Sequence, residues 1–313
     1  MCSVGIVGTG SYVPPKILTN IDLEKMVDTT DTWIIERTGI RERRIALPET
    51  TASDLGVPAS IAALQSAGIN PEDVDLIIAA TSTPDMIFPS TACFIQNKIG
   101  ASRAACFDLS AACTGFSYAL EVGRQFIATS TYKTALIVGA EVISKVLDWT
   151  DRNTCVLFGD GAGAAVLQPV ADNYGILSTN LGADGRLASI LELPVAGCIR
   201  MSGREVFKVA VNTMIEAVEK VLDSAGILQE DVSLLIPHQA NIRIIEAMGK
   251  RLNIPQEKVF VNLQKYGNVS AGSTIIALDE AVKQGRVVDG DIIVIVTFGG
   301  GLTWGATVIR WGK

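Results

Sequence analysis

The chain has 313 residues, of which 48% are hydrophobic and 19% are charged, and it contains 29 glycines. This composition excludes an intrinsically disordered protein and predicts two domains or one large doubled domain. The 26 basic and 33 acidic residues give a net charge of −7, which excludes a nucleic-acid-binding surface spread over the whole chain. The N-terminus lacks the basic region of a signal peptide, and no run approaches the roughly 18–20 apolar residues of a membrane span. We therefore expect a cytoplasmic protein with no membrane or nucleic-acid partner.

The six cysteines form no CxxC pair, and the chain has a single histidine. A zinc site built from histidine and cysteine is therefore not expected. We predict a protein that works without a metal or another bound cofactor.

The predicted elements alternate between helix and strand along the chain. Residues 53–68 have helical spacing, with Ser53 and Asp54 at the start and Gly68 as the C-cap, and residues 205–226 repeat this pattern. The continuous apolar runs at 74–81 and 232–237 are typical of strands that are buried on both faces. This alternation predicts an α/β fold with helices on both faces of its sheets.

The sequence also repeats itself. Residues 66–78 match residues 224–236 at nine of thirteen positions, with an offset of 158. The offset falls to 142 where residues 163–168 meet residues 305–310, so the first copy carries 16 extra residues near 141–156. We predict two α/β halves, residues 1–170 and 171–313, with a site between them.

The first candidate for chemistry is the segment 108–127, in which Cys113 stands at the turn from a strand into a helix. The N–H groups and the dipole at a helix N-terminus favour a thiolate and lower its pKa. Cys113 is therefore a candidate nucleophile, and the alternative is a cysteine packed among small residues.

Two further candidates lie in the second half. His238, the only histidine, follows an apolar strand, and sites in α/β folds gather at the carboxyl ends of strands. Asn268 lies in a turn before a helix and, at the 158 offset, falls on Ser110, three residues from Cys113. A structural histidine and an ordinary turn asparagine are the alternatives.

Two segments of the chain are rich in glycine, residues 297–307 and 5–11. The segment 297–307 has three consecutive glycines after a strand and can bring free N–H groups to a ligand, as in an oxyanion hole, or can be a plain tight turn. It fails as a phosphate loop, since no Lys-Ser or Lys-Thr follows. The segment 5–11 fails as a dinucleotide turn, because Pro14 and Pro15 stand where the helix would begin.

Eight motifs spread over the chain resemble those of thiolase-superfamily condensing enzymes, and specifically the β-ketoacyl-[acyl carrier protein] synthase III family. They are DTWIIERTGIRERRIA (31–46), FPSTAC (88–93), AACTGFSYAL (111–120), LFGDGAGAAVL (157–167), EVFKVAV (205–211), PHQANIRII (237–245), YGNVSAGS (266–273) and GGGLTWG (299–305). The resemblance implies the five-layered αβαβα thiolase-like fold of two duplicated halves, in a homodimer. It also implies an acyltransferase that initiates fatty acid synthesis.

The resemblance further implies a catalytic triad of Cys113, His238 and Asn268. Cys113 would take the acyl group from an acyl-CoA primer, with acetyl-CoA as the expected primer, while the N–H groups of Cys113 and Gly300 form the oxyanion hole. His238 and Asn268 would then donate hydrogen bonds to the thioester carbonyl of malonyl-acyl carrier protein as carbon dioxide leaves.

By the same resemblance, CoA would contact Trp33, Arg37, Arg152 and Asn241, with aromatic and guanidinium groups suited to a nucleobase and phosphates. Arg204 stands where the family pattern has a smaller amide, which leaves the CoA contact there open.

Two further sets of residues follow from the family pattern. The acidic acyl carrier protein would dock on the basic residues Lys208, Arg243, Lys250 and Arg251, unless these are only a solvated helix face. Phe88 would border the acyl pocket or serve in packing.

Several alternatives stay open at this point. A single histidine excludes the elongating ketoacyl synthases, which use two. A synthase-III-like enzyme that primes a secondary-metabolite pathway, of polyketide or quinolone type, is the main alternative within the superfamily. Outside it, a non-catalytic acyl-CoA or carrier-protein binding module and a cysteine hydrolase are the other two.

Overall fold

The computed structural model describes residues 2–313, and its strands form two main sheets over that range. The first sheet has the order β1-β7-β6-β4-β5, with β4 parallel to both β5 and β6 and with antiparallel pairs at β6–β7 and β7–β1. Its strands are β1 (Val4–Tyr12), β4 (Leu76–Ala80), β5 (Ala105–Leu109), β6 (Ala135–Glu141) and β7 (Gly161–Pro169).

The second sheet has the order β11-β12-β13-β8, in which only β11 and β12 are parallel. Its strands are β8 (Gly175–Ala183), β11 (Leu234–Pro237), β12 (Ile292–Gly299) and β13 (Thr303–Arg310). In the first sheet, β5 pairs with β4 as the outer strand. At the equivalent edge of the second sheet, beside β11, the described range has only a single β-bridge, between Leu235 and Val259. The first sheet is thus made of strands within residues 4–169 and the second of strands within 175–310.

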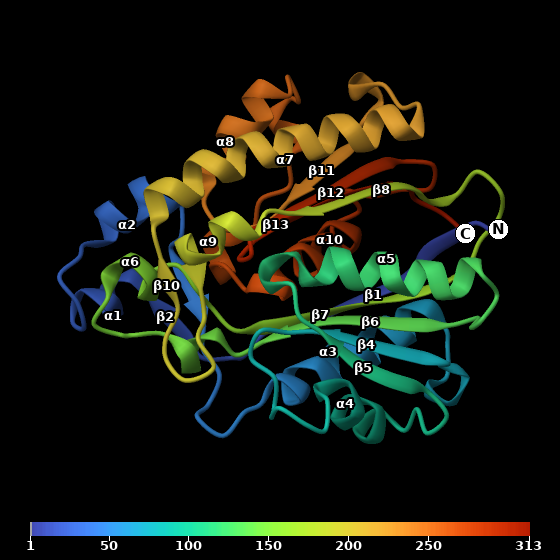
Figure 1. Cartoon of the computed structure of the whole chain (residues 1–313), viewed down its shortest axis with the longest axis horizontal. Helices are drawn as coiled ribbons and strands as arrows, with labels where there is room; N and C mark the ends of the chain where they lie inside the picture. The colour runs from blue at the N-terminus through green and yellow to red at the C-terminus, as the bar shows by residue number, and fades with distance from the viewer. Residues whose placement is uncertain (1) are drawn as a thin grey trace.

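Three helical layers enclose these two sheets, as Figure 1 shows from top to bottom. One outer layer holds α7 (Gly203–Ala225) and α8 (Ile242–Arg251), and the other holds α3 (Ala52–Ala67) and α4 (Thr91–Ile99). Between the sheets lie α5 (Gly115–Ala128) and α10 (Ser273–Lys283), whose apolar faces pack in one core with both sheets. The predicted five-layered fold of two duplicated halves is therefore confirmed.

The remaining elements are short. They are β2 (Ile17–Thr19), α1 (Asn20–Glu24), α2 (Asp31–Thr38), β3 (Glu42–Arg44), α6 (Arg152–Cys155), β9 (Leu191–Glu192), β10 (Arg200–Met201), α9 (Leu263–Tyr266) and the 3₁₀ turns η1 (Pro71–Asp73), η2 (Ala112–Thr114), η3 (Ile143–Val146), η4 (Gly185–Ile190), η5 (Gln229–Asp231), η6 (Gln256–Lys258) and η7 (Ser270–Gly272).

Local signals decide where the helices begin and end. The predicted start of α3 at Ser53 and Asp54 is slightly wrong, because Thr51 is the N-cap and forms a reciprocal capping box with Asp54. The predicted ends are right: Gly68 follows α3 with a φ of 71°, and Gly226 follows α7 with a φ of 64°.

The repeat seen in the sequence corresponds to paired elements. An offset of 158 places η2 on η7 and α5 on α10, and an offset of 142 places β7 on β13. The extra residues of the first half form η3 and α6, which line the cavity described below.

The glycines of the segment 5–11 serve helix packing. A Cβ on Gly8 or Gly10 would collide with the backbone of α3, at Ala67 and Ala59 respectively. These glycines therefore let α3 lie directly on β1. Among the helices of the described chain, none combines the length and the apolar character needed to span a membrane.

Candidate active site

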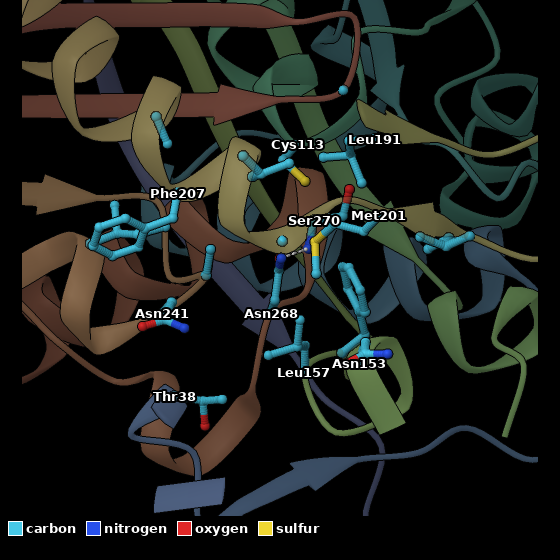
Figure 2. Close-up of a pocket in the computed structure, with 18 of the residues that line it drawn as sticks. Thr38, Cys113, Asn153, Leu157, Leu191, Met201, Phe207, Asn241, Asn268 and Ser270 are labelled. Carbon is cyan, nitrogen blue, oxygen red and sulfur yellow. Dashed lines mark hydrogen bonds between the residues drawn. The ribbon is translucent and has the colours of Figure 1, made fainter. Parts of the chain in front are cut away.

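One cavity of about 770 Å³ brings residues from both halves together. Cys113, His238 and Asn268 all line it, although they lie in three separate segments of the chain. Figure 2 shows Cys113 and Asn268 facing the same space, with Leu191 and Met201 beside them.

Cys113 is held by a strained turn. It lies in η2, between β5 and α5, and the residue before it, Ala112, has a φ of 48° in the left-handed region. Its side chain is 7% exposed.

Burial raises the pKa of the Cys113 thiol to about 11; the Glu141 carboxylate also raises it, and the Ser270 hydroxyl and Asn268 amide oppose the rise. The prediction of a lowered pKa is therefore wrong for the free cysteine, because desolvation outweighs the helix N-terminus.

His238 follows β11 and is fixed by its backbone, whose N–H donates to the carbonyl of Val296 at 2.7 Å. The side chain is 4% exposed, and neither ring nitrogen has a hydrogen-bond partner within residues 2–313. Burial lowers the pKa of the imidazole to about 4, so the ring is neutral at neutral pH. A buried, neutral and unpartnered imidazole in a cavity wall is suited to bind a polar group of a ligand.

Asn268 is oriented by the turn that follows it. Its backbone N–H donates to the carbonyl of Leu157 at 2.8 Å, and its side-chain Oδ1 accepts the N–H of Ser270 at 2.8 Å. This second bond is the dashed line in Figure 2. Because the amide oxygen is occupied, the Nδ2 group is the donor left for the cavity.

The glycine turn after β12 lies against the Cys113 turn. A Cβ on Gly299 would lie 2.8 Å from the backbone nitrogen of Cys113, so only glycine fits there. The next residue, Gly300, lines the cavity. The two backbone segments assigned to the oxyanion hole are therefore neighbours.

The four residues assigned to CoA also line this cavity. The guanidinium of Arg152 lies 5.2 Å from the ring centroid of Trp33. Asn241 joins α2 to α8: its Nδ2 donates to the carbonyl of Arg37 at 3.0 Å, and its Oδ1 caps α8. Arg204, in the first turn of α7, lines the same cavity and is exposed.

The four basic residues assigned to carrier-protein docking are exposed on α7 and α8. Arg243 lines the cavity, with its guanidinium 5.6 Å from the ring of Phe207. Lys250 and Arg251 lie at the other end of α8, about two helical turns from Arg243, and are not among the residues that line the cavity.

Phe88 lies outside the cavity of its own chain as described here. It is 82% exposed and lies in the loop before α4, next to Ile87, which is 86% exposed. Within one chain it therefore does not border the acyl pocket, because this loop turns its apolar side chains to the surface.

Sequence reasoning missed Glu141, which is fully buried at the end of β6. Its carboxylate accepts the N–H of Ser82 at 3.1 and 3.0 Å, the hydroxyl of Thr83 at 2.8 Å and the N–H of Ala271 at 3.4 Å. Burial raises the pKa of Glu141. The signal in the sequence is an acidic residue that ends an otherwise apolar strand.

In the part of the chain that the structure describes, no three histidine, cysteine, aspartate or glutamate side chains gather closely enough to hold a metal ion.

A doubled α/β fold whose halves place a buried cysteine, a neutral histidine and an oriented asparagine in one cavity defines a thiolase-like condensing enzyme. The comparisons with known proteins agree. Residues 107–185 match the family model 3-oxoacyl-[acyl-carrier-protein] synthase III, and residues 222–311 match the model of its C-terminal part.

Individual relatives cover the whole chain. A β-ketoacyl-[acyl-carrier-protein] synthase III of Desulfitobacterium hafniense is 56% identical, over 100% of this chain and 99% of that protein. The crystal structure of the Aquifex aeolicus 3-oxoacyl-[acyl-carrier-protein] synthase III has a TM-score of 0.97 at 54% identity, over 98% of this chain and 100% of that one.

A relative from another pathway is less similar. The priming β-ketosynthase of the R1128 polyketide pathway has a TM-score of 0.94 at 36% identity, over 100% of this chain and 97% of that one. The polyketide alternative therefore gains no support over the fatty-acid enzymes. The chain belongs to the β-ketoacyl-[acyl-carrier-protein] synthase III family, the condensing acyltransferases that initiate fatty acid synthesis.

Proposed function

We propose that the chain joins an acyl-CoA primer to malonyl-acyl carrier protein by decarboxylative Claisen condensation, through an acyl-Cys113 intermediate. The observation that carries this proposal is the meeting of Cys113, His238 and Asn268 in one cavity. The reaction as proposed uses only side chains and backbone N–H groups of this chain.

In the first step, the sulfur of Cys113 attacks the thioester carbonyl of the primer. The carbonyl oxygen becomes an oxyanion, which the N–H groups of Cys113 and Gly300 stabilise. The carbon–sulfur bond to CoA then breaks, CoA leaves as the thiol with the proton that Cys113 gave up, and the acyl group remains on Cys113. Because the pKa of the free thiol is about 11, this proton must leave during the attack.

In the second step, the malonyl thioester enters the same cavity. His238 and the Nδ2 group of Asn268 donate hydrogen bonds to its carbonyl oxygen, and carbon dioxide leaves as negative charge develops there. The resulting enolate carbon attacks the acyl-Cys113 carbonyl and expels the cysteine sulfur as a thiolate, which takes up a proton from water to restore the free thiol. A neutral imidazole suits this role, because it donates a hydrogen bond to the thioester carbonyl. It carries no positive charge that would form an ion pair with the malonyl carboxylate and hold it back from leaving.

The substrates proposed for this cavity are an acyl-CoA, with acetyl-CoA as the expected primer, and a malonyl-acyl carrier protein. Trp33, Arg37, Arg152 and Asn241 would hold CoA, since an indole face and guanidinium groups suit a nucleobase and phosphates. Arg243 would meet the carrier protein at the cavity entrance, with Lys208, Lys250 and Arg251 extending the contact along α7 and α8.

We also propose a homodimer that pairs through β5. This strand is the outer strand of its sheet, and Ile87 and Phe88 are exposed beside it. Asp108 of β5 accepts the N–H groups of Thr91 and Ala92 at 2.7 and 2.8 Å, which holds the start of α4 on this strand. An open sheet edge next to exposed apolar side chains is a surface that a second copy would cover.

A cytoplasmic location fits this proposal. All six cysteines, which lie within residues 2–313, are free thiols. Free thiols are usual in a reducing compartment.

The release of carbon dioxide tests the proposed function. Protein loaded with an acyl group from acyl-CoA is mixed with malonyl-acyl carrier protein, and carbon dioxide and the carrier-bound product are measured. The proposal predicts equal amounts of carbon dioxide and β-ketoacyl-carrier protein. A cysteine hydrolase would instead give free acid without carbon dioxide, and a binding module would give neither.

A further inference from the structure

One hydroxyl group connects the two backbone turns of the proposed oxyanion hole. Thr303, at the start of β13, has its Oγ1 atom 3.2 Å from the carbonyl oxygen of Ala111 and 3.0 Å from the carbonyl oxygen of Gly300. It also forms a hydrogen bond with the hydroxyl of Thr114. Thr303 is not among the residues that line the cavity, so it acts on the reaction only through these neighbours.

The contacts of Thr303 flank both assigned N–H donors. Ala111 and Thr114 stand on either side of Cys113 in the chain, and Gly300 belongs to the opposing glycine turn. The two turns already touch where Gly299 approaches the backbone nitrogen of Cys113. Loss of the hydroxyl would remove these hydrogen bonds across the junction of the two turns.

Another threonine on the same strand shows that β13 does not require such a bond. Thr307 lies four residues further on and points to the same face of the sheet, as alternation in a strand dictates. It is 1% exposed, and its hydroxyl has no hydrogen-bond partner within the described part of the chain. The bonds of Thr303 are therefore specific to the junction of the two turns.

We propose that Thr303 is a positioning residue whose hydroxyl fixes the spacing of the Cys113 and Gly300 N–H groups. Both groups can then reach one carbonyl oxygen while negative charge develops on it. This inference rests on the proposed function, because it assumes that acyl transfer to Cys113 passes through an oxyanion held by these two groups.

The test compares two reactions of the same sulfur. Acyl transfer from acyl-CoA forms an oxyanion, whereas alkylation by iodoacetamide displaces iodide and forms none. In Thr303→Val, the rate of Cys113 acylation at saturating acyl-CoA should fall by about 10- to 100-fold, less than the 10²- to 10³-fold lost with a whole donor. The alkylation rate should stay within about twofold of wild type, because the thiol and its burial are unchanged.

Matched variants complete the test. Thr303→Ser keeps the hydroxyl and should restore most of the acylation rate, and Thr303→Ala repeats the loss without the bulk of valine. Thr307→Val removes a buried hydroxyl from the same strand and should leave both reactions unchanged.

Three outcomes would overturn the inference. The first is acylation of Thr303→Val and Thr303→Ala at the wild-type rate. The second is an equal fall of acylation and alkylation in both variants, which would indicate a collapsed turn. The third is a wild-type protein that is not acylated by any acyl-CoA, which would overturn the proposed function as well.

Discussion

The Cys113 turn in the first half and the Ser270 turn in the second half have the same backbone and different chemistry. Ala112 and Ser270, which are 158 residues apart, have φ values of 48° and 47°. Each belongs to a short 3₁₀ turn that leads directly into a central helix, α5 or α10. The doubled backbone therefore supplies the geometry twice, and the proposed reaction uses different side chains in the two copies.

The two turns face each other between the sheets. A Cβ on Gly115 would lie 3.5 Å from the Cβ of Ala271, and a Cβ on Gly139 would collide with the carbonyl of Ala271. Neither half could form the proposed site alone, since the first holds the proposed nucleophile, Cys113, and the second holds His238 and Asn268. We expect Cys113, with the N–H groups beside it, to govern acyl transfer, and His238 and Asn268 to govern decarboxylation.

The largest effect is expected when His238 or Asn268, the two proposed catalytic residues of the second half, is replaced. In His238→Ala and Asn268→Ala, decarboxylation of malonyl-acyl carrier protein should fall by about 10²- to 10³-fold, as expected for the loss of a hydrogen bond to developing negative charge. Acylation of Cys113 should fall by less than about tenfold, since neither side chain is assigned to that step. Single-turnover measurements of CoA release and carbon dioxide release separate the two. Equal losses in both would contradict the assignment of His238 and Asn268 to decarboxylation.

The burial of His238 makes a second, thermodynamic prediction. The pKa of His238 is about 4 in the folded chain and 6.5 for an ordinary histidine, so the unfolded chain takes up the proton first as the pH falls. The stability contributed by the neutral ring is complete above pH 6.5 and is lost as the pH falls towards 4. The loss is about 3 kcal/mol of unfolding free energy.

The control for this prediction is His238→Asn, which has no group that titrates in this range. The difference in unfolding free energy between wild type and variant is measured at pH 6.5 and at pH 4. Because the chain has one histidine, the change in this difference between the two pH values is due to His238. Urea denaturation at several pH values measures this difference. A constant difference over that range would show that the ring takes up its proton equally in both states.

Glu141 contacts the Ser270 turn and acts electrostatically on Cys113, so its replacement tests a link between the two turns. Its carboxylate accepts the N–H of Ala271, and its charge raises the pKa of Cys113. Glu141→Gln should therefore lower the pH at which iodoacetamide alkylates Cys113 and raise the alkylation rate several-fold at pH values where the wild-type carboxylate is charged. The pH profile of alkylation checks this. A midpoint that stays in place would remove the electrostatic link between the turns.

The smallest effect is expected at the entrance, outside both turns. Arg204→Asn should raise KM for acyl-CoA by about two- to threefold without changing kcat. The effect is small because water screens the charge of an exposed cation. The effect should shrink as the ionic strength rises. Lys220→Asn, an exposed change further along α7, serves as the control, and an unchanged KM in Arg204→Asn would exclude Arg204 from CoA binding.

The sequence predicted the parts of the site that depend on local pattern and on the repeat. Cys113, His238 and Asn268 could be found because each follows a recognisable strand or turn and because the 158 offset brings Asn268 close to Cys113 in the doubled fold. Other features depend on the packed molecule. The raised pKa of Cys113 follows from burial between two sheets, and burial of that kind is not visible in the turn itself.

Glu141 and Thr303 went unnoticed for a similar reason. Both act through contacts with residues more than 50 positions away, and neither belongs to a motif that predicts chemistry by itself. The start of α3 was missed by two residues because Ser53 and Asp54 resemble a cap, whereas the capping box uses Thr51.

The most direct test of the account is the intact mass of the protein after incubation with a panel of acyl-CoAs, with Cys113→Ala alongside. The account predicts a mass increase of one acyl group on the wild-type protein and none on Cys113→Ala, with the most complete loading identifying the primer. An adduct that persists in Cys113→Ala, or a wild-type protein that takes up no acyl group from any primer, would contradict the assignment of Cys113 as the nucleophile.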